Sequence, residues 1–145
     1  MAFHRDVLEK LKGFRGVLRC AEGMDMAMGA GEAGHAIFYE TDSLVMHHHV
    51  QTRFRNVFSY FVYHGLKAII LRQRYRDFMR TPIVLRSPVL LLLGAPLIAL
   101  VNCLGVFLRN PRMAQRLHTA PVVYILKLAW CWGAVRGLIG RGADV

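Results

Sequence analysis

The chain has 145 residues, of which 54% are hydrophobic and 19% are charged, and its formal net charge is +10. The charged share lies below the roughly 25% of soluble domains, and the length allows one modest domain plus a membrane element rather than two full domains. Three cysteines without a CxxC pair imply neither a disulfide framework nor a zinc site. The first ten residues lack the apolar core of a signal peptide.

The charge is distributed unevenly. Residues 1–42 hold seven acidic and five basic side chains, whereas residues 43–145 hold fourteen basic ones against Asp77 and Asp144. A basic segment of this kind can indicate nucleic acid, anionic lipid or the positive-inside signal of a membrane protein. Because five arginines crowd the entrance to a long apolar run, we expect membrane lipids as partners and no nucleic acid. These arginines are Arg72, Arg74, Arg76, Arg80 and Arg86.

The first third of the chain predicts two short helices. An apolar stripe between Asp6 and Gly13 indicates the first helix, with the glycine as its stop. From Glu22 to Ala33 apolar residues again recur at helical spacing and Gly34 ends the pattern. Three internal glycines weaken this second helix by roughly 1 kcal/mol each, so we expect it to be marginal alone.

Two short strands are expected next. The segments Ala36–Glu40 and Ser43–Met46 are rich in β-branched and aromatic residues, and Thr41 with Asp42 forms a turn between them.

From Gln51 onward phenylalanines recur at helical intervals among arginines, a pattern typical of a basic amphipathic helix on a membrane surface. Pro82 and Pro88 are expected to break it. The alternative is a cationic helix packed on its own soluble domain.

Membrane helices are expected in the last part of the chain. The 22 residues between Arg86 and Arg109 carry no charge, and as a helix they reach about 33 Å, enough for a hydrocarbon core of roughly 30 Å. The alternative is a buried core helix. A second apolar stretch, Ala120–Ile139, contains Lys127 and Arg136, which lie about 180° apart around a helix and so disfavour a helix lying flat on the membrane. We expect a hairpin of helices at about 87–108 and 120–139, with the N-terminal side cytoplasmic.

Three sequence blocks resemble the acceptor-side half of glycosyltransferase family 2 enzymes. They are MAFHRDVLEKLKGF, AEGMDMAM and EAGHAIFYETDSLVMHHH, in the family's order and spacing, and the resemblance covers about residues 1–65. It implies a GT-A type, Rossmann-like α/β fold that binds a nucleotide-diphosphate sugar with a divalent metal, Mg or Mn, at a DxD motif. It also implies inverting transfer to a lipid-linked or cell-envelope polysaccharide acceptor at the cytoplasmic face of the inner membrane.

The expected fold class is therefore an α/β fragment, mostly helical. It is the C-terminal part of a GT-A domain with two short strands, followed by a basic amphipathic helix and one or two membrane helices. The expected boundaries are 1–50 for the acceptor-side part, 51–82 for the amphipathic helix and 83–145 for the membrane helices.

The resemblance also assigns the candidate catalytic residues. In the family, a Glu-Asp pair supplies the base that deprotonates the acceptor hydroxyl. Here Glu22 matches the Glu, but Gly23 stands at the position of the base. Asp25 is the next carboxylate, although two residues on it lies about 200° around a helix. His47 is the candidate that faces the active centre from the second strand. The alternative of a metal site at the three consecutive histidines that start at His47 lacks a third ligand at suitable spacing, so we expect no metal site.

No DxD motif occurs in the 145 residues. We therefore expect a C-terminal piece of a longer enzyme, which needs a donor half to bind the nucleotide sugar and the acceptor and is inactive alone. For this chain alone we expect neither a cofactor nor cofactor-binding residues. The competing hypothesis is a small noncatalytic membrane protein whose basic helix binds anionic lipid or a partner subunit.

Overall fold

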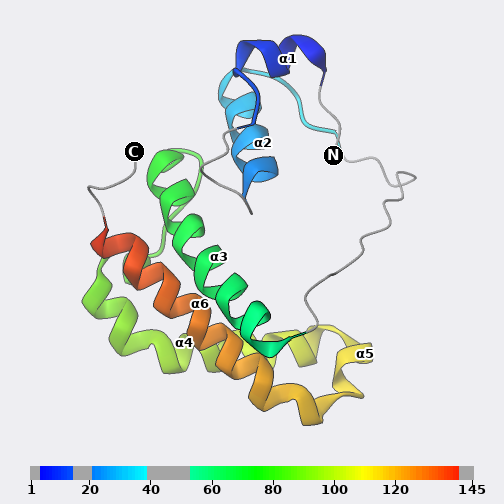
Figure 1. Cartoon of the computed structure of the whole chain (residues 1–145), viewed down its shortest axis with the longest axis vertical. Coiled ribbons are helices and arrows are strands. Elements are labelled where there is room, and N and C mark those ends of the chain that lie inside the picture. Colours follow the sequence, from blue (N-terminus) through cyan, green and yellow to red (C-terminus); the bar gives the residue numbers. More distant parts are fainter. Residues whose placement is uncertain (1–3, 15–20, 39–52, 141–145) are drawn as a thin grey trace. The chain divides into compact units, whose positions relative to one another are not determined.

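The computed structural model describes residues 4–14, 21–38 and 53–140. These residues form six α-helices and two short 3-10 helices, with no strand among them. The chain separates into two compact units, Met1–Val50 and Gln51–Val145. The first holds α1 and α2, and the second holds the helices from α3 onward (Figure 1).

The expected α/β fold class is wrong, because every element of regular structure in the described residues is a helix. Residues 36–38, the described part of the first predicted strand, have no regular structure. The rest of that strand and the second one, Ser43–Met46, lie outside the described residues. β-branched and aromatic residues favour a strand only where a neighbouring strand completes the hydrogen bonds. The described residues offer no such neighbour.

Helix α1 spans Arg5–Lys10, and its end is set by backbone hydrogen bonds. The Gly13 N–H donates to the Leu8 carbonyl at 2.8 Å and the Lys12 N–H to the Glu9 carbonyl at 3.1 Å, the pattern of a Schellman motif. Both Lys12 and Gly13 have positive φ, at 59° and 73°. The predicted stop at Gly13 is therefore one residue late, because the left-handed position directly after the C-cap falls on Lys12.

Helix α2 spans Glu22–Glu32 and ends in the same motif. The His35 N–H donates to the Ala30 carbonyl at 2.9 Å and the Gly34 N–H to the Gly31 carbonyl at 3.0 Å. Gly34 has φ +80°, a conformation that only glycine adopts without strain. The predicted stop at Gly34 is confirmed.

In the second unit, α3 (Phe54–Arg74) is followed by a turn, by η2 (Ile83–Arg86) and by α4 (Pro88–Arg109). Helix α3 ends at Arg74, well before Pro82. The start of α4 follows from its sequence, because the Ser87 hydroxyl accepts from the Leu90 N–H at 3.4 Å and Pro88 occupies the first helical position, where no N–H is needed.

The remaining elements are α5 (Pro111–Ala114), η3 (Leu117–Thr119) and α6 (Ala120–Ile139). Helices α4 and α6 run in opposite directions as a hairpin, and α3 lies along α6 in the same direction as α6 (Figure 1). Helix α6 is thus the central helix of the second unit. The sequence predicted a basic amphipathic helix on a membrane surface over residues 51–82. In the structure, α3 covers only part of that segment and packs on α6.

The α3–α6 interface depends on glycine. A Cβ added at Gly133 would overlap the Val62 backbone, and one added at Gly65 would overlap the Trp130 carbonyl group. At Gly137 it would lie 2.9 Å from the Leu66 carbonyl oxygen. Small residues at four-residue spacing let helix backbones approach in this way, which is a common arrangement between membrane helices.

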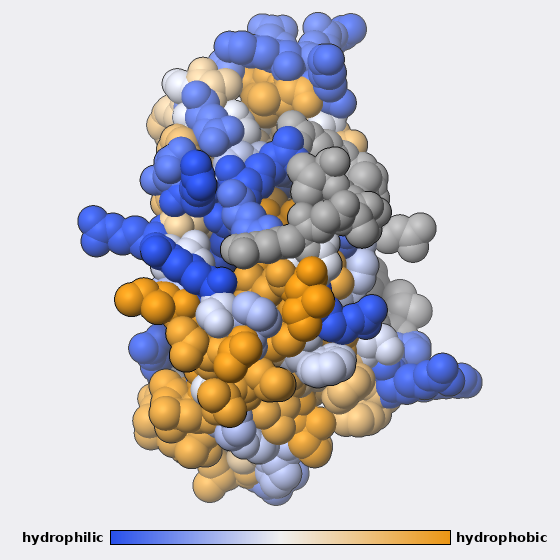
Figure 2. Space-filling view, turned by 90° about the vertical axis from the view of Figure 1, so that its left-hand side faces the viewer, coloured by the Kyte–Doolittle hydropathy of each residue, from blue (hydrophilic) through white to orange (hydrophobic). Residues whose placement is uncertain are grey.

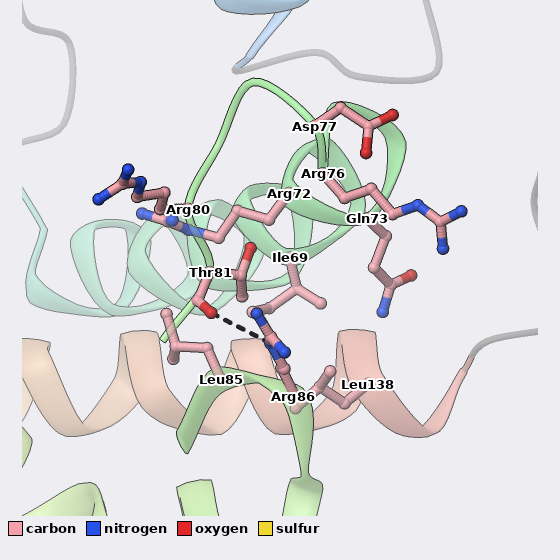
Figure 3. Close-up of a pocket in the computed structure, with 10 residues that line it drawn as sticks. All are labelled: Ile69, Arg72, Gln73, Arg76, Asp77, Arg80, Thr81, Leu85, Arg86 and Leu138. Carbon is pink, nitrogen blue, oxygen red and sulfur yellow. Dashed lines mark hydrogen bonds between the residues drawn. The ribbon is translucent and has the colours of Figure 1, made fainter. Parts of the chain in front are cut away.

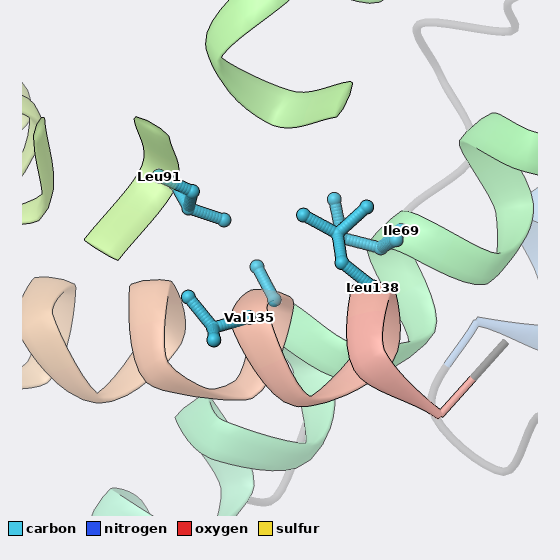
Figure 4. Close-up of a cluster of buried hydrophobic side chains, with 5 residues drawn as sticks. Ile69, Leu91, Val135 and Leu138 are labelled. Atoms are coloured by element: carbon cyan, nitrogen blue, oxygen red, sulfur yellow. The ribbon is translucent and has the colours of Figure 1, made fainter. Parts of the chain in front are cut away.

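Helix α4 faces α6 with one residue in every four. This buried stripe begins at Leu91 and continues through two alanines, and its members are Leu91, Ala95, Ala99, Cys103 and Phe107. One end of it joins the apolar core of the unit, where Ile69 of α3 meets Val135 and Leu138 of α6 (Figure 4). The three long helices therefore share one apolar core.

Two helical segments, Pro88–Arg109 and Leu117–Ile139, are long and apolar enough to cross a membrane. Only 22% of the apolar window of α4 is buried inside the structure, with Leu93 and Leu97 exposed by 75% and 66%. Figure 2 shows apolar residues gathered on one face over these helices. The described part of the chain therefore leaves most of this apolar surface uncovered, unlike the buried core helix considered as the alternative.

Two polar side chains on the hairpin are hydrogen-bonded to backbone carbonyl groups. The Asn102 side-chain amide donates to the Ile98 carbonyl at 2.8 Å, and the Tyr124 hydroxyl donates to the Pro96 carbonyl at 3.4 Å. Such pairing reduces the cost of placing polar atoms in a hydrocarbon environment.

Candidate functional site

Helix α2 carries the predicted carboxylates. Glu22 lies in its first turn and is partly exposed, whereas Asp25 is buried, with 5% of its surface accessible. A three-residue separation places these two side chains about 60° apart around the helix, on neighbouring positions. Gly23, where the family resemblance places the base, points about 200° away from Asp25. Glu22 and Asp25 therefore occupy neighbouring positions on α2, and Gly23 at the expected base position has no carboxylate.

His47 lies outside the described residues, as do His48 and His49. Another histidine of the first unit, His35, has a buried ring nitrogen. His35 Nε2 is buried and has no hydrogen-bond partner among the described residues. A buried imidazole nitrogen costs free energy until another group pairs with it. The sequence did not single out His35, whose only signal is its place directly after the helix stop at Gly34.

The divalent metal implied by the resemblance finds no ligand set in the described residues. No group of three or more His, Cys, Asp and Glu side chains gathers there. Glu22 and Asp25 alone are too few for an all-protein metal site. The described residues therefore do not fit a divalent metal.

A cluster of four arginines lies in the second unit. The last turns of α3, the turn that follows it, η2 and the end of α6 surround a pocket of about 760 Å³ (Figure 3). Ile69, Leu85 and Leu138 supply its apolar lining. The polar lining consists of four arginines with three other side chains: Arg72, Arg76, Arg80, Arg86, Gln73, Asp77 and Thr81. We call this cavity the basic pocket.

The arginines enter the basic pocket from different elements. In Figure 3, Arg72 and Arg80 lie on one side, Arg76 and Gln73 lie on the other, and Arg86 lies between them. The Arg86 Nε donates to the Thr81 carbonyl at 3.1 Å. The sequence predicted that these arginines meet phospholipid headgroups, but not that they line one cavity.

The charge of the basic pocket is not neutralised within the described chain. Four arginines face a single carboxylate, that of Asp77. No ion pair within the described residues engages these four arginines. The C-terminal ends of α3 and α6 lie beside the pocket, and their helix dipoles favour cations there.

No protein-family model, curated protein or solved structure matches this chain. The resemblance to glycosyltransferase family 2 therefore rests on the three sequence blocks alone.

Proposed function

We propose that this chain forms the acceptor side and the membrane-associated part of an inverting glycosyltransferase of family 2 type. The enzyme transfers sugar from a nucleotide-diphosphate sugar to a lipid-linked or cell-envelope polysaccharide acceptor, at the cytoplasmic face of the inner membrane. One observation carries the proposal. The carboxylates of α2 precede, in the family's order, a basic helix and two membrane-length helices.

Glycosyl transfer needs a base that Gly23 cannot supply. A sugar hydroxyl is a poor nucleophile, and a positioned carboxylate must remove its proton as the bond to the sugar forms. Gly23 has no proton-accepting side chain. Glu22 and Asp25 are the nearest carboxylates on α2, but neither occupies the expected position. The chain alone is therefore inactive, and the donor sugar is bound by a separate segment or subunit with a DxD motif.

A second function, a noncatalytic membrane protein that binds anionic lipid or a partner subunit, is favoured by Gly23 and by the charge of the basic pocket. The two functions differ in one measurable property. Only a transferase regains sugar transfer when a carboxylate returns at position 23 in the presence of a donor-side domain.

The experiment is transfer of radiolabelled sugar by a fusion of the full chain to a family donor-side domain. The restoring variant is Gly23→Asp. Gly31→Asp is a matched control, because it adds the same carboxylate to α2 at a position where a Cβ meets nothing within 4 Å.

A further inference from the structure

The basic pocket gathers four arginines around one cavity, an arrangement that glycosyl transfer does not explain. We propose that it is a binding site for a phosphate group, carried by a lipid headgroup or free in solution. This inference deepens the second function, binding of anionic lipid, and does not rest on the transferase function, so it stands if no sugar transfer is found.

The first argument is the chemistry of the lining. An arginine guanidinium presents five N–H donors in a planar fork that matches phosphate oxygens two at a time. In the described chain, only one donor of Arg86 has a hydrogen-bond acceptor. No hydrogen bond or ion pair engages the guanidinium groups of Arg72, Arg76 and Arg80 in that part of the chain. The pocket therefore has many donors that an anion with several oxygens can satisfy.

The second argument is charge. Four arginines around one cavity repel each other, and Asp77 offsets only one of them. A phosphomonoester carries about −1.5 to −2 charge near neutral pH and three acceptor oxygens. It therefore neutralises more of this cluster than a carboxylate, which carries a single charge.

The third argument is position. Arg86 directly precedes the Ser87 cap of α4, and Leu138 lies in the last turn of α6. The pocket thus lies at the end of the hairpin where one membrane-length helix begins and the other ends. Lipid phosphates are concentrated at this level, and basic pockets between membrane helices bind such headgroups. The apolar lining continues into the shared core through Ile69 and Leu138, which suits the apolar part of a lipid.

The test uses the full chain in neutral detergent micelles. Short-chain phosphatidic acid and inorganic phosphate are titrated separately, and binding is followed by phosphorus NMR. The pocket variant is Arg76→Gln with Arg86→Gln. The matched control is Arg112→Gln with Arg116→Gln, which removes the same charge at the opposite end of the hairpin. Circular dichroism checks that the helices remain.

We expect the pocket variant to bind phosphatidic acid about tenfold more weakly or worse, because charge-assisted hydrogen bonds are lost, and the control to stay within about twofold. Arg76→Lys with Arg86→Lys keeps the positive charge but removes the planar guanidinium donors. This variant should lose less affinity for phosphatidic acid than the glutamine variant. If inorganic phosphate displaces phosphatidic acid, the site is assigned to free phosphate. If it does not, the site is assigned to the lipid headgroup. Equal losses in the pocket and control variants, or no saturable binding by the unmodified chain, would overturn the proposal.

Discussion

Gly133 of α6 lies against the backbone of Val62 of α3, so closely that an added Cβ would overlap the Val62 carbonyl group. A second contact of the same kind joins Gly65 of α3 to Trp130 of α6. Each helix thus provides a glycine at which the backbone of the other fits. This reciprocal packing fixes α3 along the hairpin rather than apart from it.

Replacing Gly133 with alanine should destabilise the second unit. The added methyl group has no space against the Val62 backbone, and overpacking of this kind costs about 1–3 kcal/mol. Gly105→Ala on α4 is the control, since a Cβ there meets nothing within 4 Å and alanine is the better helix former. Thermal unfolding in detergent, followed by circular dichroism, should show a lower midpoint for Gly133→Ala only. A similar loss in both variants would mean that the close α3–α6 contact is not formed.

Membrane association should resist salt and carbonate. The exposed leucines of α4 form a surface whose transfer out of lipid costs far more than ionic screening can reverse. After membrane fractionation, the chain should stay in the pellet in high salt and in alkaline carbonate, and neutral detergent should release it. Release by salt alone would show that the arginines, and not the apolar helices, hold it there.

The orientation of the hairpin can be tested with single cysteines. Positive charge on the cytoplasmic side predicts that Thr81 faces the cytoplasm and that Gln115, in the connection between α4 and α6, faces outward. In a Cys20→Ser background, a membrane-impermeant thiol reagent applied to intact cells should label Gln115→Cys and not Thr81→Cys. Cys103 and Cys131 are buried and should stay unlabelled. Labelling of Thr81→Cys alone would show the opposite orientation, in which the basic pocket lies outside the cell.

The sequence predicted α4 from a run of 22 uncharged residues and α6 from a second apolar stretch, because long apolar runs are local signals. The same holds for the glycine stop at Gly34, whose positive φ depends on one residue. The strand predicted at Ala36–Glu40 was wrong over its described residues, 36–38, because propensity cannot show whether a partner strand exists.

The basic pocket and the α3–α6 interface could not be read from local patterns. The pocket requires that α3 ends at Arg74 and that the following turn brings Arg80 and Arg86 back beside Arg72. The interface joins Gly65 to α6, far along the sequence, and nothing near either glycine indicates the other. Glu22 and Asp25 were predicted as candidates, and their neighbouring positions on α2 follow from their spacing.

The central claim, that α2 belongs to the acceptor side of a glycosyltransferase, is tested most directly by sugar transfer in the donor-side fusion. With Gly23 the acceptor hydroxyl lacks its base, so turnover should be about 10²- to 10⁴-fold below that of the Gly23→Asp fusion. The Gly31→Asp fusion should stay as low as the unmodified one. Equal turnover with Gly23 and with Asp, or no transfer by the Gly23→Asp fusion while it still binds the nucleotide sugar, would contradict the account.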